Sequence, residues 1–221
     1  MAQIESDLQL LKTEVVNMWN LVISQLTNAK LAFENYDKDL AREVVAKEKR
    51  VNATELKIDR DCENIFALFC PVAIDLRFLL ATLKINSNLE RIGDIAEGIA
   101  KYVISADGPF HSGLLEDTGT LKMYEESINI LTDTLTSFMA EDTILARSVF
   151  KKDEYLDQIN LDSNRAIESY LVSHPEDLSQ ALWILSIIRK LERVGDQSKN
   201  IAEEIIFYLE AKVVKHNKAG R

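Results

Sequence analysis

Apolar side chains recur along most of the chain at alternating steps of three and four residues, which is the period of one buried face of an α-helix. The two clearest stripes are Leu89, Ile92, Ala96, Ile99 and Val103, and Leu191, Val194, Ser198, Ile201 and Ile205. Pro71, Pro175 and the Gly108-Pro109 pair interrupt the pattern. The spacing therefore predicts six helices, at about 3–34, 37–69, 73–105, 116–140, 142–172 and 176–215.

One segment of the chain occurs twice. Residues 89–100 read LERIGDIAEGIA and residues 191–202 read LERVGDQSKNIA, with seven of twelve positions identical at an offset of 102. The same offset pairs Asp75 with Asp177 and Ile65 with Ile167, in an alignment without gaps. The repeat predicts an all-α protein of two tandem three-helix bundles, one spanning 1–107 and the other 114–221.

Composition supports this fold class and narrows the function. The chain has 7 Gly and 3 Pro, where average usage in 221 residues gives about 15 and about 11. Its 26 Lys and Arg against 36 Asp and Glu give a net charge of −10, which opposes nucleic-acid binding. The longest apolar run, from Ile65, stops at Asp75, so no membrane insertion is expected. With no signal peptide in MAQIESDLQLLK, we expect a cytoplasmic protein.

Acidic side chains form further stripes at helical spacing. In the order of the chain these are Glu48, Asn52, Glu55 and Asp59; Glu90, Asp94, Glu97 and Lys101; Asp153, Asp157, Asn160 and Asn164; and Glu192, Asp196, Asn200 and Glu203. Like charges at this spacing cost a helix a few tenths of a kcal/mol per pair, and a cation between neighbouring helices would offset that cost. Oxygen ligands without nearby His or Cys suit Mg²⁺, Mn²⁺, Ca²⁺ or carboxylate-bound iron. The alternative is that these are solvated helix faces, partly neutralised by Arg91 and Arg193.

Other chemistry is less well supported by the sequence. The chain has no Gly-x-Ser-x-Gly elbow, Walker loop or dinucleotide-binding glycine pattern. A ferritin-like di-iron enzyme needs Glu-x-x-His, but Ala100 and Ile206 follow Glu97 and Glu203 at that spacing. The three histidines, His111, His174 and His216, are expected in loops or at the chain end, and Trp19 and Trp183 in the core or an interface.

Three segments resemble the PhoU family of bacterial phosphate-transport regulators. They are RVNATELKID at 50–59, DLRFLLATLKINSNLERIGD at 75–94 and NIAEEIIFYLEAKVVKH at 200–216. The resemblance covers nearly the whole chain, because both halves end in a helix with the Leu-Glu-Arg-Ile/Val-Gly-Asp motif. It implies a non-enzymatic, homodimeric negative regulator of the phosphate regulon and of phosphate uptake.

The resemblance also implies partners and a metal. The protein would couple the ATPase subunit of a phosphate ABC transporter to a membrane sensor histidine kinase, with protein partners holding it at the inner face of the membrane. The metal is left open among iron, zinc, manganese and magnesium. The residues that match the family's metal-binding positions are Glu55, Asp59, Glu90, Asp94, Glu97, Asp157, Glu192, Asp196 and Asn200. The two sites are unlike at two positions. At the offset of 102, Leu161 stands where Asp59 would recur, and Gly98 corresponds to Asn200.

Two other functions remain compatible with the sequence. Paired hard cations held by carboxylates can activate water, so one alternative is a metal-dependent phosphate-ester hydrolase. The other is a structural helical adaptor that binds no metal.

Overall fold

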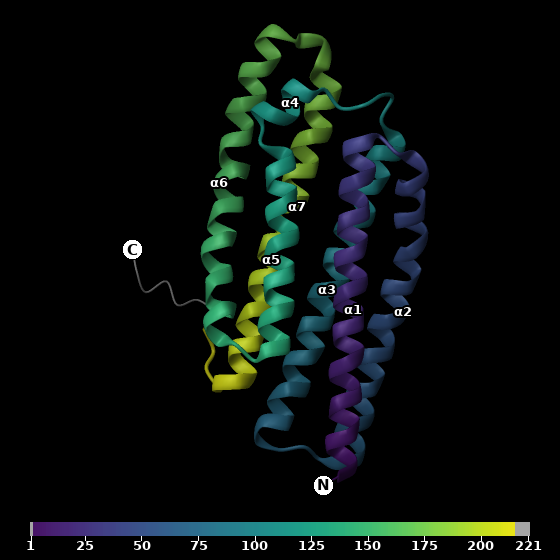
Figure 1. Cartoon of the computed structure of the whole chain (residues 1–221), viewed down its shortest axis with the longest axis vertical. Coiled ribbons are helices and arrows are strands. Elements are labelled where there is room, and N and C mark those ends of the chain that lie inside the picture. The colour runs from purple at the N-terminus through teal and green to yellow at the C-terminus, as the bar shows by residue number, and fades with distance from the viewer. Residues whose placement is uncertain (1, 215–221) are drawn as a thin grey trace.

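The computed structural model describes residues 2–214, and this part of the chain folds into helices without a β-strand. The helices are α1 (Ala2–Asn35), α2 (Lys38–Phe69), α3 (Ala73–Ser105), α4 (Ser112–Asp117), α5 (Thr120–Ala140), α6 (Thr143–Ser173), the 3₁₀ turn η1 (Pro175–Asp177) and α7 (Leu178–Glu210). Figure 1 shows α1–α3 side by side in one half and α5–α7 in the other. The all-α prediction of two tandem three-helix units is confirmed.

The helix boundaries follow local chemistry. Asp37 caps α2 by accepting hydrogen bonds from the backbone N–H groups of Asp39 and Leu40, and Asp142 caps α6 in the same way. Gly119, at φ 64°, separates α4 from α5, so the helix predicted at 116–140 begins at Thr120, and residues 116–117 belong to the separate short helix α4. The last helix ends at Glu210 because Ala211 takes a left-handed conformation, which is earlier than the predicted end at 215.

The two halves pack through antiparallel helix pairs. At the centre, α3 lies against α7, where Lys84 Nζ donates to both carboxylate oxygens of Glu204 and the Tyr102 ring lies 4.9 Å from the Trp183 ring. On the face seen in Figure 1, α1 lies beside α5, and Trp19 Nε1 donates to Leu131 O across this pair at 3.2 Å. Both tryptophans therefore lie in contacts between the halves, as predicted.

The predicted stripes of α3 and α7 form the core. Each of their ten side chains is buried, and the offset of 102 relates nearly every buried position of α3 to one of α7. Helices of this length depend on such a continuous apolar face, because the face buries the area that stabilises the bundle.

A different offset relates α2 to α6. Their buried residues pair at 105: Ala41 with Ala146, Val44 with Val149, Glu48 with Asp153, Val51 with Leu156, Ile58 with Ser163, Cys62 with Ile167 and Ile65 with Tyr170. The ungapped pairing of Ile65 with Ile167 was wrong. Between the last buried pair of α2 and α6 (Ile65 with Tyr170) and the first buried pair of α3 and α7 (Leu79 with Ala181), the second repeat has three residues fewer, so the gap falls around the tip of the hairpin.

Several smaller expectations can be checked in residues 2–214. His111 and His174 flank helix ends as predicted, whereas His216 lies outside the described residues. Cys62 and Cys70 are both free thiols. Within the described chain, no helix is both long and apolar enough to span a bilayer.

Candidate functional site

A glycine in each half lets two helices approach closely beside the acidic stripes. A Cβ atom on Gly93 of α3 would lie 2.9 Å from Val51 Cγ1 and 3.3 Å from Glu48 Oε2 of α2. A Cβ on Gly195 of α7 would lie 2.8 Å from Asp153 Oδ1 of α6. The 2.9 Å and 2.8 Å distances are too short for a Cβ atom, so the glycines of the repeated Gly-Asp motif set the spacing of α2 to α3 and of α6 to α7.

The acidic stripes face each other across these two helix pairs. We call Glu48, Glu55, Asp59, Glu90, Asp94 and Glu97 the first-repeat carboxylates, and Asp153, Asp157, Glu192 and Asp196 the second-repeat carboxylates. Each set draws its members from two helices, as the spacing predicted.

Glu48 is the most deeply buried of the first-repeat carboxylates. It is 4% exposed, and neither carboxylate oxygen has a hydrogen-bond partner within the described chain. Burial raises the pKa of Glu48 to about 7, and the charges of Asp94, Glu97 and Glu90 add to the rise. An unpaired buried carboxylate is costly, so this group needs either a proton or a cation.

The other first-repeat carboxylates are coupled to one another. Burial raises the pKa of Glu55, with further contributions from Asp59 and Asp94. Burial likewise raises the pKa of Glu90, with Asp94 and Glu55 adding to the rise and Arg91 opposing it. The predicted residues of the first half therefore lie within electrostatic reach of one another.

Two of the first-repeat carboxylates have local partners. Asn86 Nδ2 donates to Asp59 Oδ1 at 2.9 Å, and Lys101 Nζ donates to Glu97 Oε2 at 2.6 Å. The amide group of Asn86 orients Asp59 across the helix pair, whereas Lys101 holds Glu97 from one turn along α3.

The second-repeat carboxylates contain an internal ion pair. Asp153 is 1% exposed, and its Oδ2 accepts a hydrogen bond from Lys199 Nζ at 2.7 Å, while Oδ1 has no partner within the described chain. Burial raises the pKa of Asp153, and Lys199 opposes that rise. Burial also raises the pKa of Glu192 and of Asp196, and in both cases Asp157 adds to the rise. The last predicted ligand, Asn200, is partly exposed one turn beyond Asp196.

The donor chemistry fits a hard divalent cation. Acidic stripes of two helices flank each glycine-spaced helix contact, and beside Gly93 both oxygens of Glu48 lack a hydrogen-bond partner within residues 2–214. In the side-chain positions seen, no three Asp, Glu, His or Cys side chains of residues 2–214 already surround a common point. Binding would therefore require side-chain rotation about fixed helices.

Glu48 and Asp153 belonged to the predicted acidic stripes but not to the predicted ligands. A signal for them exists in the sequence, because each carboxylate occupies a position of an apolar stripe. Glu48 lies between Val44 and Val51, and Asp153 lies between Val149 and Leu156. A charge in a buried stripe of this kind indicates a special role.

Comparison with known proteins identifies the family. A model described as the PhoU domain matches this chain twice, at residues 15–103 and 120–205. The chain belongs to the PhoU family. The phosphate-specific transport system accessory protein PhoU of Edwardsiella tarda is 34% identical over 97% of this chain and 87% of its own length. The protein of that name from Escherichia coli K12 is 32% identical, over 97% of this chain and 88% of its own.

Solved PhoU structures share the fold. The crystal structure of PhoU from Pseudomonas aeruginosa superposes with a TM-score of 0.88 at 29% identity, covering 94% of this chain and 99% of that chain. The phosphate transport system regulatory protein PhoU from Streptococcus pneumoniae gives 0.86 at 28% identity, with 96% and 99% covered. The two PhoU domain matches coincide with the two three-helix units described above.

Proposed function

We propose that this protein is an accessory regulator of a phosphate-specific transport system, acting without catalysis to restrain uptake and phosphate-regulated transcription when phosphate is plentiful. The match to accessory proteins of that name over 97% of the chain carries the proposal. Its partners are a second copy of the chain, the ATPase subunit of the transporter and a membrane sensor histidine kinase.

We further propose that divalent cations take part in this regulation. The residues that would hold them are the first- and second-repeat carboxylates, with Asn200 as a further oxygen donor. A bound cation supplies positive charge between acidic helices. The unpaired Glu48 carboxylate, held against Gly93, supports this assignment. Holding α2 against α3 would fix the outer surfaces of the bundle that partners contact.

The regulatory proposal is tested in a strain of the native host that lacks the gene. A reporter under phosphate control should be active there even in phosphate-rich medium, and the wild-type gene should restore repression. The Asp94→Ala, Asp196→Ala double variant should fail to restore it. Full repression by the double variant would contradict a role for the carboxylates, and a silent reporter in the deletion strain would contradict the regulatory function itself.

The cation proposal is tested by elemental analysis of protein purified without chelator. We expect iron, manganese, zinc or magnesium in the wild type and a large loss in the Asp94→Ala, Asp196→Ala variant. Glu63→Ala, Glu168→Ala is the matched control, because these exposed glutamates lie at equivalent positions of α2 and α6, outside both carboxylate sets. Equal metal in all three proteins would contradict the assignment.

A further inference from the structure

The two repeats differ at one position that faces the buried carboxylate. At the offset of 102 that relates α3 to α7, Lys199 corresponds to Glu97. In the second repeat the ammonium of Lys199 lies 2.7 Å from Asp153 Oδ2. In the first repeat the equivalent side chain is itself a carboxylate, paired with Lys101, and Glu48 keeps two unpartnered oxygens within the described chain.

Further differences change the number of carboxylates. At the offset of 105 established by burial, helix α6 has Asn160 in place of Glu55 and Asn164 in place of Asp59, whereas Asp157 takes the place of Asn52. In α7, Ile188 replaces Asn86, so the Asn86 to Asp59 hydrogen bond has no counterpart. The second repeat therefore has fewer carboxylates than the first, and the Lys199 ammonium already places a positive charge beside Asp153.

We propose that the two repeats bind divalent cations unequally. The first-repeat carboxylates bind the cation tightly, whereas in the second repeat the Lys199 ammonium occupies the position beside Asp153 where a cation would bind. This inference rests on the cation binding proposed above. A divalent ion entering the second repeat would have to displace Lys199 from Asp153 and then lie beside its charge. The first repeat imposes no such exchange at Glu48, which is buried beside Gly93 and has no hydrogen-bond partner for its carboxylate within the described chain.

The test is Mn²⁺ binding by equilibrium dialysis with the full-length protein. In the wild-type background, Asp94→Ala should lower Mn²⁺ affinity by about tenfold or more. Removing a residue that only supports a metal ligand already has an effect of that size. Asp196→Ala should leave the affinity within about twofold, since the tightly bound ion is placed elsewhere. Lys199→Glu should add further bound Mn²⁺, and Asp196→Ala in that background should remove the addition.

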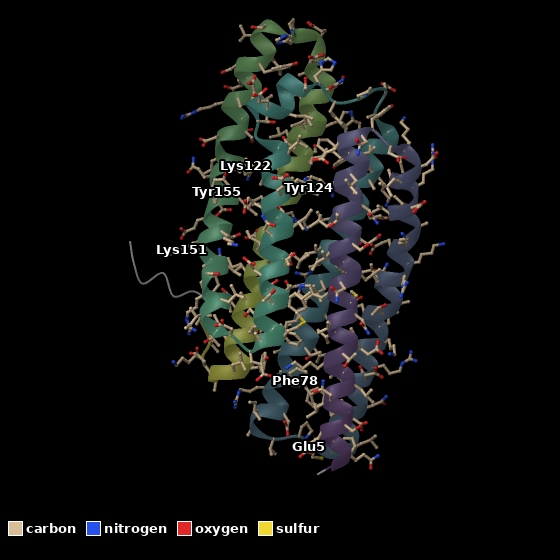
Figure 2. All side chains as sticks on the ribbon, in the orientation of Figure 1. Glu5, Phe78, Lys122, Tyr124, Lys151 and Tyr155 are labelled. Carbon is tan, nitrogen blue, oxygen red and sulfur yellow. The ribbon has the colours of Figure 1, made fainter. Side chains whose placement is uncertain are left out.

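A charge-matched control is Lys151→Glu, which makes the same charge change on α6 outside the carboxylate sets. Lys151 is exposed and, in Figure 2, lies on the outer side of α6. This variant should bind as much Mn²⁺ as the wild type. Circular dichroism establishes that each variant is folded, and the Asp94→Ala and Asp196→Ala comparison stands even if Lys199→Glu does not fold.

The outcomes separate this inference from the proposal beneath it. If Asp94→Ala and Asp196→Ala each remove a similar share of tightly bound Mn²⁺, the repeats are equal and the inference is overturned, while cation binding stands. If the wild type binds no Mn²⁺, both fail. If Lys151→Glu gains as much bound Mn²⁺ as Lys199→Glu, the gain depends on the net charge of the protein and not on the position of Lys199. That result would also overturn the role of Lys199.

Discussion

Replacing Trp19 with alanine should lower the free energy of unfolding by about 3–5 kcal/mol, which is the range for truncating a fully buried large aromatic side chain. Trp19 is 0% exposed, and its ring lies 5.4 Å from the ring of Phe138, on α5 of the other half. Phe138 in turn contacts the rings of Phe78 and Tyr208; Figure 2 labels Phe78 in the lower part of the bundle. The variant would leave a cavity between the repeats.

Urea unfolding followed by circular dichroism measures this loss. Trp19→Phe is the control, because it retains an aromatic ring while removing the Nε1 hydrogen bond to Leu131 O. We expect this control to lose clearly less stability than the alanine variant, since most of the apolar contact remains. A Trp19→Ala protein within about 1 kcal/mol of the wild type would contradict the position of Trp19 in the core.

The second large effect concerns Glu48 and pH. The pKa of this carboxyl is raised from its ordinary 4.5 to about 7, first by burial and then by Asp94, Glu97 and Glu90. The folded protein therefore binds the proton of Glu48 more tightly than the unfolded chain does. This proton contributes in full to the free energy of unfolding below pH 4.5, and the contribution is lost as pH rises through 7. For metal-free protein the loss amounts to about 3 kcal/mol.

Urea unfolding in the presence of chelator, at pH 5 and at pH 8, tests this prediction. Glu48→Gln cannot ionise, so it should be the more stable protein at pH 8 and should show a smaller decline between the two pH values than the wild type. Glu63→Gln, at an exposed position of the same helix, should follow the wild type. Parallel pH profiles for wild type and Glu48→Gln would show that Glu48 does not titrate in this range.

Sequence periodicity predicted the long helices well, because their stability depends on one continuous apolar face. Leu89, Ile92 and Ile99 have the 3.6-residue period, and all three are fully buried. The short helix α4 spans Ser112–Asp117 and has too few turns to show a period. The predicted helix at 116–140 therefore misses α4 except for its last two residues and crosses the break at Gly119, a residue type that often marks a turn.

The site was predicted less completely than the fold. The repeated Gly-Asp motif predicted the two helices α3 and α7, and their acidic stripes lie on those helices in the structure. Helices α2 and α6 lack an equally strong motif, so the sequence offers only the offset of 102 to align them. Asp59 was therefore matched to Leu161, which is 68% exposed, when its structural counterpart is Asn164. Only the burial of α2 and α6 reveals the three-residue gap.

The three-residue difference between the two hairpin tips also has a practical consequence. Within one molecule, equivalent helix pairs are joined by 13 residues between Ile65 and Leu79 and by 10 residues between Tyr170 and Ala181, without disturbing the buried pairs below. Turn length is thus tolerant of change at this end of the repeat. A fluorophore attached at the exposed thiol of Cys70 should report on nearby binding events while leaving the first- and second-repeat carboxylates intact.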